Sequence, residues 1–323
     1  MFLKHKRLGR TGLYVTAMGL GAYQLTGEFG VHYDEARKIL DYALNSGVNY
    51  IDTAQMYGFG ESEELVGRAL RRHSGKNIYI SDKVGYADRS VARNLEQAAY
   101  RDPVALKRMI KHSFWLLQRD YVEIFMIHEP DLADWWGIDY KTGDSVILDV
   151  LEELKKEGVI GNIGLGCWHS STLAQLCDTG RFDVALNAGG ITLFHRPMFD
   201  VGLVEVCAKH DVGVIVGGVL QQGFAGELIA MQPQIAEAYK NDENPDVKLR
   251  GAKLAKLYDL CNQSGIPILD LSLRYVLSFE GIHCHIPGAR LEAHIKQNIE
   301  ISRKGPLPPD VVEEIIKIST LTL

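Results

Sequence analysis

Short apolar runs and longer stretches of helical periodicity alternate along this chain. The apolar runs end in small or polar residues, and helix-spaced segments follow them. Near-continuous apolar runs are typical of parallel strands that are covered on both faces. The predicted strands are residues 16–20, 48–52, 77–83, 122–128, 161–166, 183–188, 212–217 and 282–286.

Polar residues and glycines mark the ends of the predicted helices. Asp34 is placed to cap the first helix, and Gly47 is placed to close it. Asp102 precedes Pro103, a cap residue followed by proline at the first helical position. The first helix has one apolar face, made of Ala36, Ile39, Leu40, Ala43 and Leu44. This alternation of strands and helices predicts an α/β fold, either closed into a barrel or spread into a doubly wound sheet.

Composition narrows the classes of function. The 323 residues are 46% hydrophobic and 24% charged, an ordinary balance for a globular chain with a sizeable core. With 35 Lys and Arg against 41 Asp and Glu, the net charge of −6 favours neither a nucleic-acid nor a membrane partner. No signal peptide or membrane-spanning run is visible, and the five cysteines form no CxxC pair or disulfide framework. We therefore expect a cytoplasmic protein.

Two predicted connections are longer than packing requires. One covers about 129–144, after the fourth strand, and the other about 218–250, after the seventh. Long loops in compact domains are usually functional or disordered. Both leave the C-terminal ends of strands, where a barrel enzyme keeps its active site.

Four polar residues lie at or just after the ends of three successive predicted strands. Asp52 ends the second strand, and Tyr57 follows it in the next loop. Lys83 ends the third strand, and His128 ends the fourth. Each residue alone fits a structural role, as a turn cap, an ion-pair partner, a surface aromatic or a satisfied histidine. In a barrel these strands are neighbours, so the joint position favours a catalytic interpretation.

The expected chemistry of this group is proton transfer at a tyrosine. An ammonium beside Tyr57 would favour the phenolate, and a carboxylate behind Lys83 would fix the position and charge of that lysine. Lowering the pKa of the phenol by about three units would require about 4 kcal/mol of differential interaction. His128 could then orient a carbonyl or hydroxyl oxygen towards the tyrosine.

Several motifs resemble one known family. The segment YIDTAQMYGFGESE at 50–63 resembles the aldo-keto reductase signature D-T-A-x-x-Y-G. The segments at 8–23, 81–83, 120–131 and 286–298 are similar to further family motifs in the same order and spacing. This resemblance implies a single (β/α)8 TIM barrel over residues 1–323. It also implies a catalytic tetrad of Asp52, Tyr57, Lys83 and His128.

The resemblance further implies NAD or NADP as cofactor, bound without a Rossmann fold, and no metal. This agrees with the absence of a GxGxxG motif after any predicted strand. Arg290 would suit a 2′-phosphate, so we expect tolerance of both dinucleotides. The glycine-bearing segment 218–224 could line the pyrophosphate with backbone N–H groups. The expected cofactor-binding residues are Gly21, Ala22, Tyr23, Asp52, Asn187, Gly218, Val219, Leu220, Gln221, Gly223, Pro287, Gly288, Arg290, His294, Gln297 and Asn298.

Three features of the family pattern for holding the nicotinamide are absent. Gly166 and Cys167 stand where the family usually has Ser-Asn, and Gly217 stands where an aromatic commonly stacks. Leu186, with Asn187 beside it, replaces a usual glutamine. The segments NAGGITL and VGGVLQQG are similar to the branch that contains D-threo-aldose 1-dehydrogenases, with pyridoxal dehydrogenases close by.

The expected substrate is therefore an aldose or a similar small carbohydrate. Tryptophan faces stack well on the C–H faces of sugars, although a Trp pair in a loop also packs as core beneath it. The expected substrate-binding residues are Tyr23, Trp135, Trp136, Trp168 and His169.

The predicted reaction is hydride transfer between nicotinamide and a carbonyl or carbinol carbon. Tyr57 would donate or accept the proton, Lys83 would tune Tyr57, Asp52 would orient Lys83, and His128 would position the substrate oxygen. Two alternatives stay open. One is a nicotinamide-binding regulatory subunit with little turnover. The other is a metal-dependent barrel hydrolase, for which the HxH at 283–285 is the only nearby ligand pair. The sequence indicates no oligomeric state.

Overall fold

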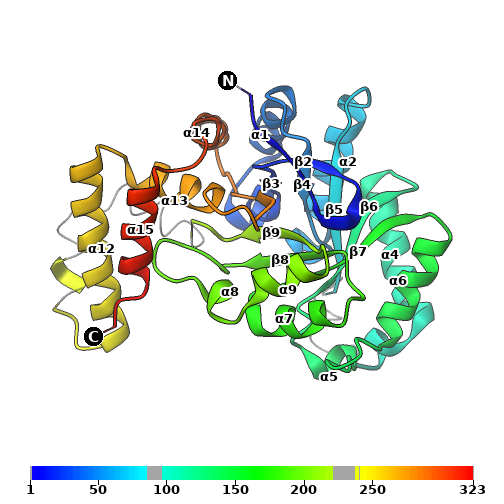
Figure 1. Ribbon diagram of the computed structural model, residues 1–323. Helices are drawn as coiled ribbons and strands as arrows, with labels where there is room; N and C mark the ends of the chain where they lie inside the picture. The colour runs from blue at the N-terminus through cyan, green and yellow to red at the C-terminus, as the bar shows by residue number, and fades with distance from the viewer. Residues whose placement is uncertain (1, 86–96, 221–236, 240, 323) are drawn as a thin grey trace.

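Parallel strands curl into a barrel in this computed structural model, which describes residues 2–85, 97–220, 237–239 and 241–322 (Figure 1). The eight-stranded sheet has the order β10-β9-β8-β7-β6-β5-β4-β3. Its strands are β3 (Leu20–Gly21), β4 (Tyr50–Asp52), β5 (Tyr79–Val84), β6 (Val122–His128), β7 (Ile160–Cys167), β8 (Val184–Ala188), β9 (Gly213–Gly217) and β10 (Cys284–His285).

The two edges of this sheet meet at a seam that closes the barrel. Met18 pairs with His285 in a parallel bridge, and the backbone N–H of Gly19 donates to the oxygen of His285 at 2.8 Å. The backbone N–H of Gly21 donates to the oxygen of Pro287 at 3.4 Å. The predicted (β/α)8 barrel is therefore confirmed, and the doubly wound alternative is excluded.

Helices cover the outside of the barrel (Figure 1). They are α1 (Tyr33–Asn45), α2 (Glu61–Arg72), α4 (Pro103–Leu117), α5 (Ala133–Trp136), α6 (Val146–Lys156), α7 (Ser170–Asp178), α8 (Pro197–Asp200), α9 (Leu203–Lys209), α12 (Pro245–Ser264), α13 (Ile268–Leu277), α14 (Glu292–Arg303) and α15 (Pro309–Ser319). Short 3-10 turns near the mouth include η2 (Tyr23–Leu25), η3 (Gly27–Phe29) and η4 (Tyr57–Gly60). In the described part of the chain, no helix combines the length and apolar character that a membrane span needs.

The helix signals in the sequence were mostly correct. All five residues of the predicted apolar face of α1 are buried. The carboxylate of Asp102 accepts a hydrogen bond from the N–H of Val104 at 2.9 Å, which confirms the predicted cap of α4. The prediction for Asp34 is wrong, because α1 begins two residues earlier than such a cap requires, at Tyr33, and His32 is its N-cap. Asp34 instead lies in the first turn, where its charge favours the helix dipole.

A hairpin closes the end of the barrel away from the strands' C-termini. Strands β1 (His5–Arg7) and β2 (Tyr14–Thr16) pair antiparallel, so the predicted strand 16–20 is divided between this hairpin and β3. Leu8 and Val15 from the hairpin are fully buried with the barrel-interior residues, among them Ile124 and Ile215. This apolar plug leaves polar side chains for the opposite end of the barrel, where the candidate site lies.

Candidate active site

Lys83 lies at the centre of a buried polar cluster at the C-terminal ends of β4 and β5. Its Nζ lies 2.8 and 2.7 Å from the two carboxylate oxygens of Asp52 and 3.1 Å from the hydroxyl oxygen of Tyr57. It also donates to the backbone oxygen of Thr53 at 2.9 Å. Asp52 pairs in register with Ser81 on the neighbouring strand, so residues of β5 at alternate positions reach the same interior. The structure thus brings Asp52, Tyr57 and Lys83 together.

Two residues that the sequence analysis did not name hold Asp52 in place. The hydroxyl of Ser81 donates to Asp52 Oδ1 at 2.7 Å, and the hydroxyl of Tyr50 donates to Ser81 Oγ at 2.5 Å. Both side chains are fully buried. Tyr50 precedes Asp52 by two positions, and Ser81 precedes Lys83 by two positions. The period-two alternation of a strand is the signal that could have identified them.

Tyr57 opens a left-handed turn between β4 and α2. Gly58, Phe59 and Gly60 all have positive φ, of 61°, 52° and 101°. A Cβ on Gly58 would lie 2.8 Å from Cγ2 of Thr26, so this position requires glycine for both its φ and its space. The turn holds the ring of Tyr57 against Lys83, whose Nζ lies 4.7 Å from the ring centroid.

The expectation that Tyr57 is unusually acidic is wrong, because burial outweighs the charge of Lys83. Burial raises the pKa of Tyr57 to about 12; Lys83 opposes this shift, while Asp52 adds to it. The carboxylate of Asp52 therefore offsets much of the ammonium charge that was expected to favour a phenolate. Burial alone would lower the pKa of Lys83, but Asp52 and Tyr57 raise it above its ordinary value. At neutral pH the cluster holds a phenol and an ammonium group.

His128 ends β6 on the other side of Tyr57. The two ring centroids lie 6.0 Å apart with an interplanar angle of 83°. Burial, together with the charge of Lys83, holds the pKa of His128 well below its ordinary value. The imidazole is therefore neutral, and it can exchange a hydrogen bond with a substrate oxygen without adding a charge.

The tryptophan pair of the 129–144 segment lies beneath that segment. Trp136 is 1% exposed, and its Nε1 donates to the backbone oxygens of His128 at 3.0 Å and Glu129 at 3.2 Å. Trp135 is half-buried and stacks on Tyr100 with centroids 5.4 Å apart. The prediction that Trp136 lines a substrate wall is corrected, because it is a core residue that fixes the backbone after β6.

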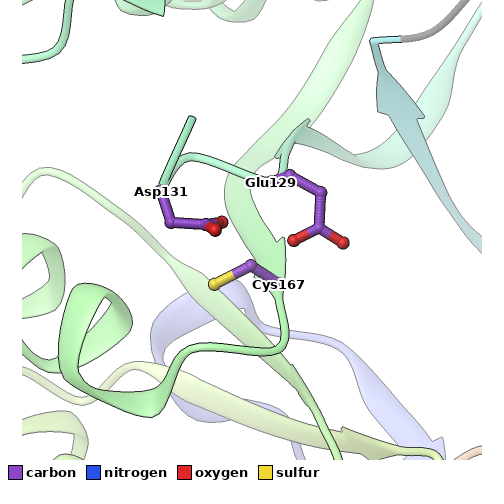
Figure 2. Close-up of side chains that lie close together, drawn as sticks. All are labelled: Glu129, Asp131 and Cys167. Carbon is purple, nitrogen blue, oxygen red and sulfur yellow. The ribbon is translucent and has the colours of Figure 1, made fainter. Parts of the chain in front are cut away.

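Two carboxyl groups and a thiol lie close together just after His128 and at the end of β7 (Figure 2). Glu129, Asp131 and Cys167 come from the ends of β6 and β7, and their ligand atoms lie within 4.8 Å of one another. Asp131 pairs with Nδ1 of His169 at 2.7 Å, and the thiol of Cys167 donates to the backbone oxygen of His169 at 3.5 Å. Burial, with the negative charge of Asp131, raises the pKa of Glu129 to about 7.

These three residues are a donor set that could hold a cation, but their contacts within the protein also account for them. Glu129 and Asp131 were not predicted as site residues, although they lie within three positions of His128. Trp168 lies next to this group in the chain and is 46% exposed. His169 is also largely exposed, so both predicted residues lie at the surface of the mouth.

Residues from both ends of the chain form a continuous row away from Tyr57. The rings of Tyr23 and Tyr57 lie 4.8 Å apart, and those of Tyr23 and Phe29 lie 4.7 Å apart. The guanidinium of Arg290 lies 5.2 Å from the centroid of Phe29. Gly21, Ala22, Pro287 and Gly288 form the backbone of the seam beside this row. The structure thus brings together the predicted cofactor residues of the first and last strands.

The start of α14 carries the remaining predicted groups. Arg290, His294 and Gln297 are exposed, whereas Asn298 is buried and donates to the backbone oxygen of Gly288 at 3.3 Å. Glu35, which the sequence analysis did not name, accepts a hydrogen bond from the N–H of Glu292 at 2.6 Å. One of the backbone N–H groups at the start of α14 that could bind an anion is therefore already bonded to a carboxylate.

The loop after β9 contributes Gly218, Val219 and Leu220. Gly218 has a φ of 65°, and a Cβ there would lie 3.4 Å from the ring of Trp168. Val219 is buried and Leu220 is half-buried. The predicted residues Gln221 and Gly223 lie outside the described residues.

One of the positions that depart from the family pattern, Gly166, has a structural explanation. A Cβ on Gly166 would lie 3.3 Å from both Cδ and Cε of Lys83, so the lysine stem occupies the space of a side chain there. Asn187 is fully buried; it accepts from Ser170 Oγ at 2.7 Å and donates to the backbone oxygens of Cys167 and Trp168 at 3.2 Å. The prediction of Asn187 as a cofactor contact is corrected, because its amide is used in fixing the β7–α7 turn.

The comparisons with known proteins agree with the geometry. A model described as "Aldo/keto reductase family" matches residues 17–320. The chain is 24% identical to a D-threo-aldose 1-dehydrogenase of Pseudomonas sp, over 90% of each protein. It is 24% identical to a probable voltage-gated potassium channel subunit beta of Arabidopsis thaliana, over 98% of this chain and 97% of that protein. It is similar to the holo form of aldo-keto reductase AKR11C1 from Bacillus halodurans, with a TM-score of 0.75, 22% identity and coverage of 99% and 98% of the two chains.

Proposed function

The chain belongs to the aldo/keto reductase family, and from this premise we propose that it is an NAD(P)-dependent oxidoreductase acting on an aldose or a similar small carbohydrate. The observation that carries the proposal is the position of Lys83 Nζ, 3.1 Å from Tyr57 Oη and 2.7 Å from Asp52. A buried phenol bonded to a charge-paired ammonium is suited to proton transfer at a substrate oxygen.

Each member of the tetrad has a distinct role in this proposal. A bound nicotinamide supplies the hydride for a carbonyl carbon or accepts one from a carbinol carbon. Tyr57, protonated at neutral pH, donates its proton to the substrate oxygen in the reducing direction. Lys83 stabilises the phenolate that results, Asp52 fixes Lys83, and neutral His128 orients the oxygen.

The described residues fit a dinucleotide along the row from Tyr57 to α14. Tyr23 and the backbone of Gly218 would hold the nicotinamide end, and Arg290, His294 and Gln297 would hold the adenosine end. The usual carboxamide-binding side chains are absent at Gly166 and Cys167. Five free cysteines also fit the reducing cytoplasm that we propose for this protein.

A hydroxylated substrate suits the groups at the mouth. The exposed face of Trp168 can stack on the C–H face of a sugar, and the oxygens of Glu129 and Asp131 can accept hydrogen bonds from hydroxyls. The relative named D-threo-aldose 1-dehydrogenase supports the same substrate class.

Turnover of a substrate panel by the chain and by Tyr57→Phe tests this proposal. The assay follows reduced-nicotinamide absorbance with aldoses and pyridoxal, using each dinucleotide in turn. We expect Tyr57→Phe to lower turnover by roughly 10²–10⁴-fold, because the proton donor is lost. Dinucleotide affinity, measured by quenching of tryptophan fluorescence, should change little. An equal loss of binding and turnover would contradict the assignment.

A second candidate is a nicotinamide-binding regulatory subunit with little turnover. The likeness to a probable potassium channel subunit beta favours keeping this candidate. Such a protein would bind dinucleotide in the fluorescence titration but would turn over no member of the panel. The same two measurements therefore distinguish the two functions.

A further inference from the structure

A pair of carboxyl groups is buried on the outer face of β5, directly behind Lys83. Asp82 lies between Ser81 and Lys83 in this strand, so its side chain points to the opposite face. Glu63 comes from the first turn of α2. Asp82 is 0% exposed and Glu63 is 1% exposed.

The two carboxyl groups contact each other without an ordinary donor between them. Their proximity is evident from the electrostatic interaction of Asp82 with Glu63, which helps to raise the pKa of Glu63. Glu63 Oε1 and Asp82 Oδ2 are nevertheless buried oxygens for which no N–H or O–H donor is in reach among the described residues. Two ionised carboxylates offer only acceptors, and placing both charges in a site shielded from bulk solvent costs several kcal/mol, about as much as an unpaired buried ion. A single proton between the two oxygens would satisfy both.

The surrounding groups support one retained proton. Burial raises the pKa of Asp82 to about 6, and it raises the pKa of Glu63 well above its ordinary value. The charged groups that act on the pair are Lys83, in the same strand, and Asp52, in β4. From α4, Ser113 contributes a neutral hydroxyl to Glu63.

The pair is connected to the backbone on both sides of the Lys83 side chain. Asp82 Oδ1 accepts from the N–H of Lys83 at 2.8 Å. Ser113 Oγ, next to Glu63, accepts from Nε2 of Gln55 at 2.8 Å. Gln55 Oε1 in turn accepts from the N–H of Gly85 at 3.2 Å. A displacement of either carboxyl group would therefore be transmitted to the end of β5.

We propose that Glu63 and Asp82 share one proton and that this acid pair positions Lys83 against Tyr57, an inference that rests on the proposed function for its second half. Removing the proton places two like charges in contact and drives Asp82 away from Glu63. Because Asp82 Oδ1 holds the N–H of Lys83, the lysine then loses its alignment with Tyr57. Glu63 and Asp82 are positioning residues, since neither reaches the interior of the barrel.

Infrared spectroscopy tests the shared proton without any turnover. At neutral pH the wild-type chain should show the carbonyl stretch of a buried, protonated carboxyl group. Glu63→Gln and Asp82→Asn should each remove this band, because the amide replaces the proton as donor and the remaining carboxyl group ionises. Glu64→Gln, one position further along α2, is the matched control and should keep the band, because Glu64 is only partly buried and pairs with Arg68. A wild-type spectrum without the band, or a band that survives in both variants, overturns the proposal.

The pH profile of turnover tests the positioning role. In the wild-type chain turnover should fall when the shared proton is lost on the alkaline side. Glu63→Gln carries a permanent donor, so it should retain turnover to a pH at least about one unit higher, with a neutral-pH rate within about twofold of wild type. Glu64→Gln should follow the wild-type profile. An unchanged alkaline limb in Glu63→Gln overturns the positioning role. If no variant turns over any substrate, the proposed function fails and the positioning role with it, while the infrared result still decides whether the proton is shared.

Discussion

The two faces of β5 carry buried ionisable groups, and the loss of hydration of these groups is compensated differently on each face. On the inner face, Lys83 and Asp52 form an opposite-charge pair with atoms 2.7 Å apart. On the outer face, Glu63 and Asp82 carry the same charge when ionised. Both groups lose their contact with water on folding, and this loss disfavours each charge.

The difference lies in what compensates for the lost hydration. The inner pair is compensated by a counter-charge and by hydrogen bonds from Ser81 and to Thr53, none of which depends on pH near neutrality. The outer pair needs a proton from solution. A strand therefore places a pH-insensitive cluster and a pH-sensitive cluster at adjacent positions simply by alternating its side chains.

The largest expected effect comes from breaking the inner pair. Asp52→Asn leaves the ammonium of Lys83 buried without its counter-charge, so we expect a loss of about 3–5 kcal/mol in the free energy of unfolding. Urea denaturation measures this loss. Adding Lys83→Met to Asp52→Asn removes the unpaired charge and should recover part of the stability. A loss below about 1 kcal/mol for Asp52→Asn would show that the inner pair is not the stronger cluster.

The next effect is the response of the outer pair to pH. The folded chain keeps a proton that the unfolded chain releases near the ordinary carboxyl pKa, so the contribution of this pair to stability falls as pH rises. The fall should begin near the ordinary glutamate pKa of about 4.3 and reach about 1.4 kcal/mol per pH unit for one proton. For Asp82 it extends to its folded pKa of about 6, and the raised pKa of Glu63 carries it further.

Urea denaturation across this pH range measures the slope in the wild-type chain and in Glu63→Gln. The variant should show a slope smaller by about one proton, because its amide cannot titrate. Equal slopes in the two proteins would remove the distinction drawn between the two faces of β5.

A smaller effect is expected inside the inner cluster. Ser81→Ala removes a donor to Asp52 and leaves the hydroxyl of Tyr50 without its acceptor. Because the Lys83–Asp52 pair survives, the loss should be about 1–2 kcal/mol in the same denaturation assay. Adding Tyr50→Phe removes the hydroxyl that has lost its acceptor, and this should recover part of the lost free energy of unfolding.

The smallest effect is expected from an ion pair of similar length at the surface. The guanidinium of Arg7 lies 2.7 Å from Asp211, but the two side chains are 51% and 48% exposed. Water and salt screen this pair, so Arg7→Ala should cost less stability than any of the substitutions above, and less still at high salt. A loss as large as that of Asp52→Asn would show that burial is not what separates the two pairs.

The barrel strands were predictable because their apolar runs are local signals. The predicted strand 122–128 coincides with β6, every residue of which is buried. The predicted strand 16–20 was divided, because apolar residues continue through the connection between the hairpin and β3. An apolar run reports burial, and it does not report where one sheet ends and the next begins.

The tetrad was predictable because each member lies at or just after a strand end. The environment of those residues was not predictable. The acidity of Tyr57 was misjudged because the sequence shows the charge of Lys83 but does not show the larger effect of burial. Trp136 was misplaced because the orientation of a loop side chain depends on Tyr100 and on the backbone of β6. The contact of Glu63 with Asp82 depends on how α2 packs on β5, which no local pattern encodes.

The seam between β3 and β10 has a consequence for biosynthesis. It joins residues from near the two ends of the chain, and β10 pairs with β9 through only two residues. Contacts between such distant residues form slowly, because a long loop must close first. A nascent chain that stops before residue 284 would leave the free edges of β3 and β9 exposed as templates for aggregation. The chain must therefore be synthesised at least as far as residue 285 before the barrel can protect its own strands.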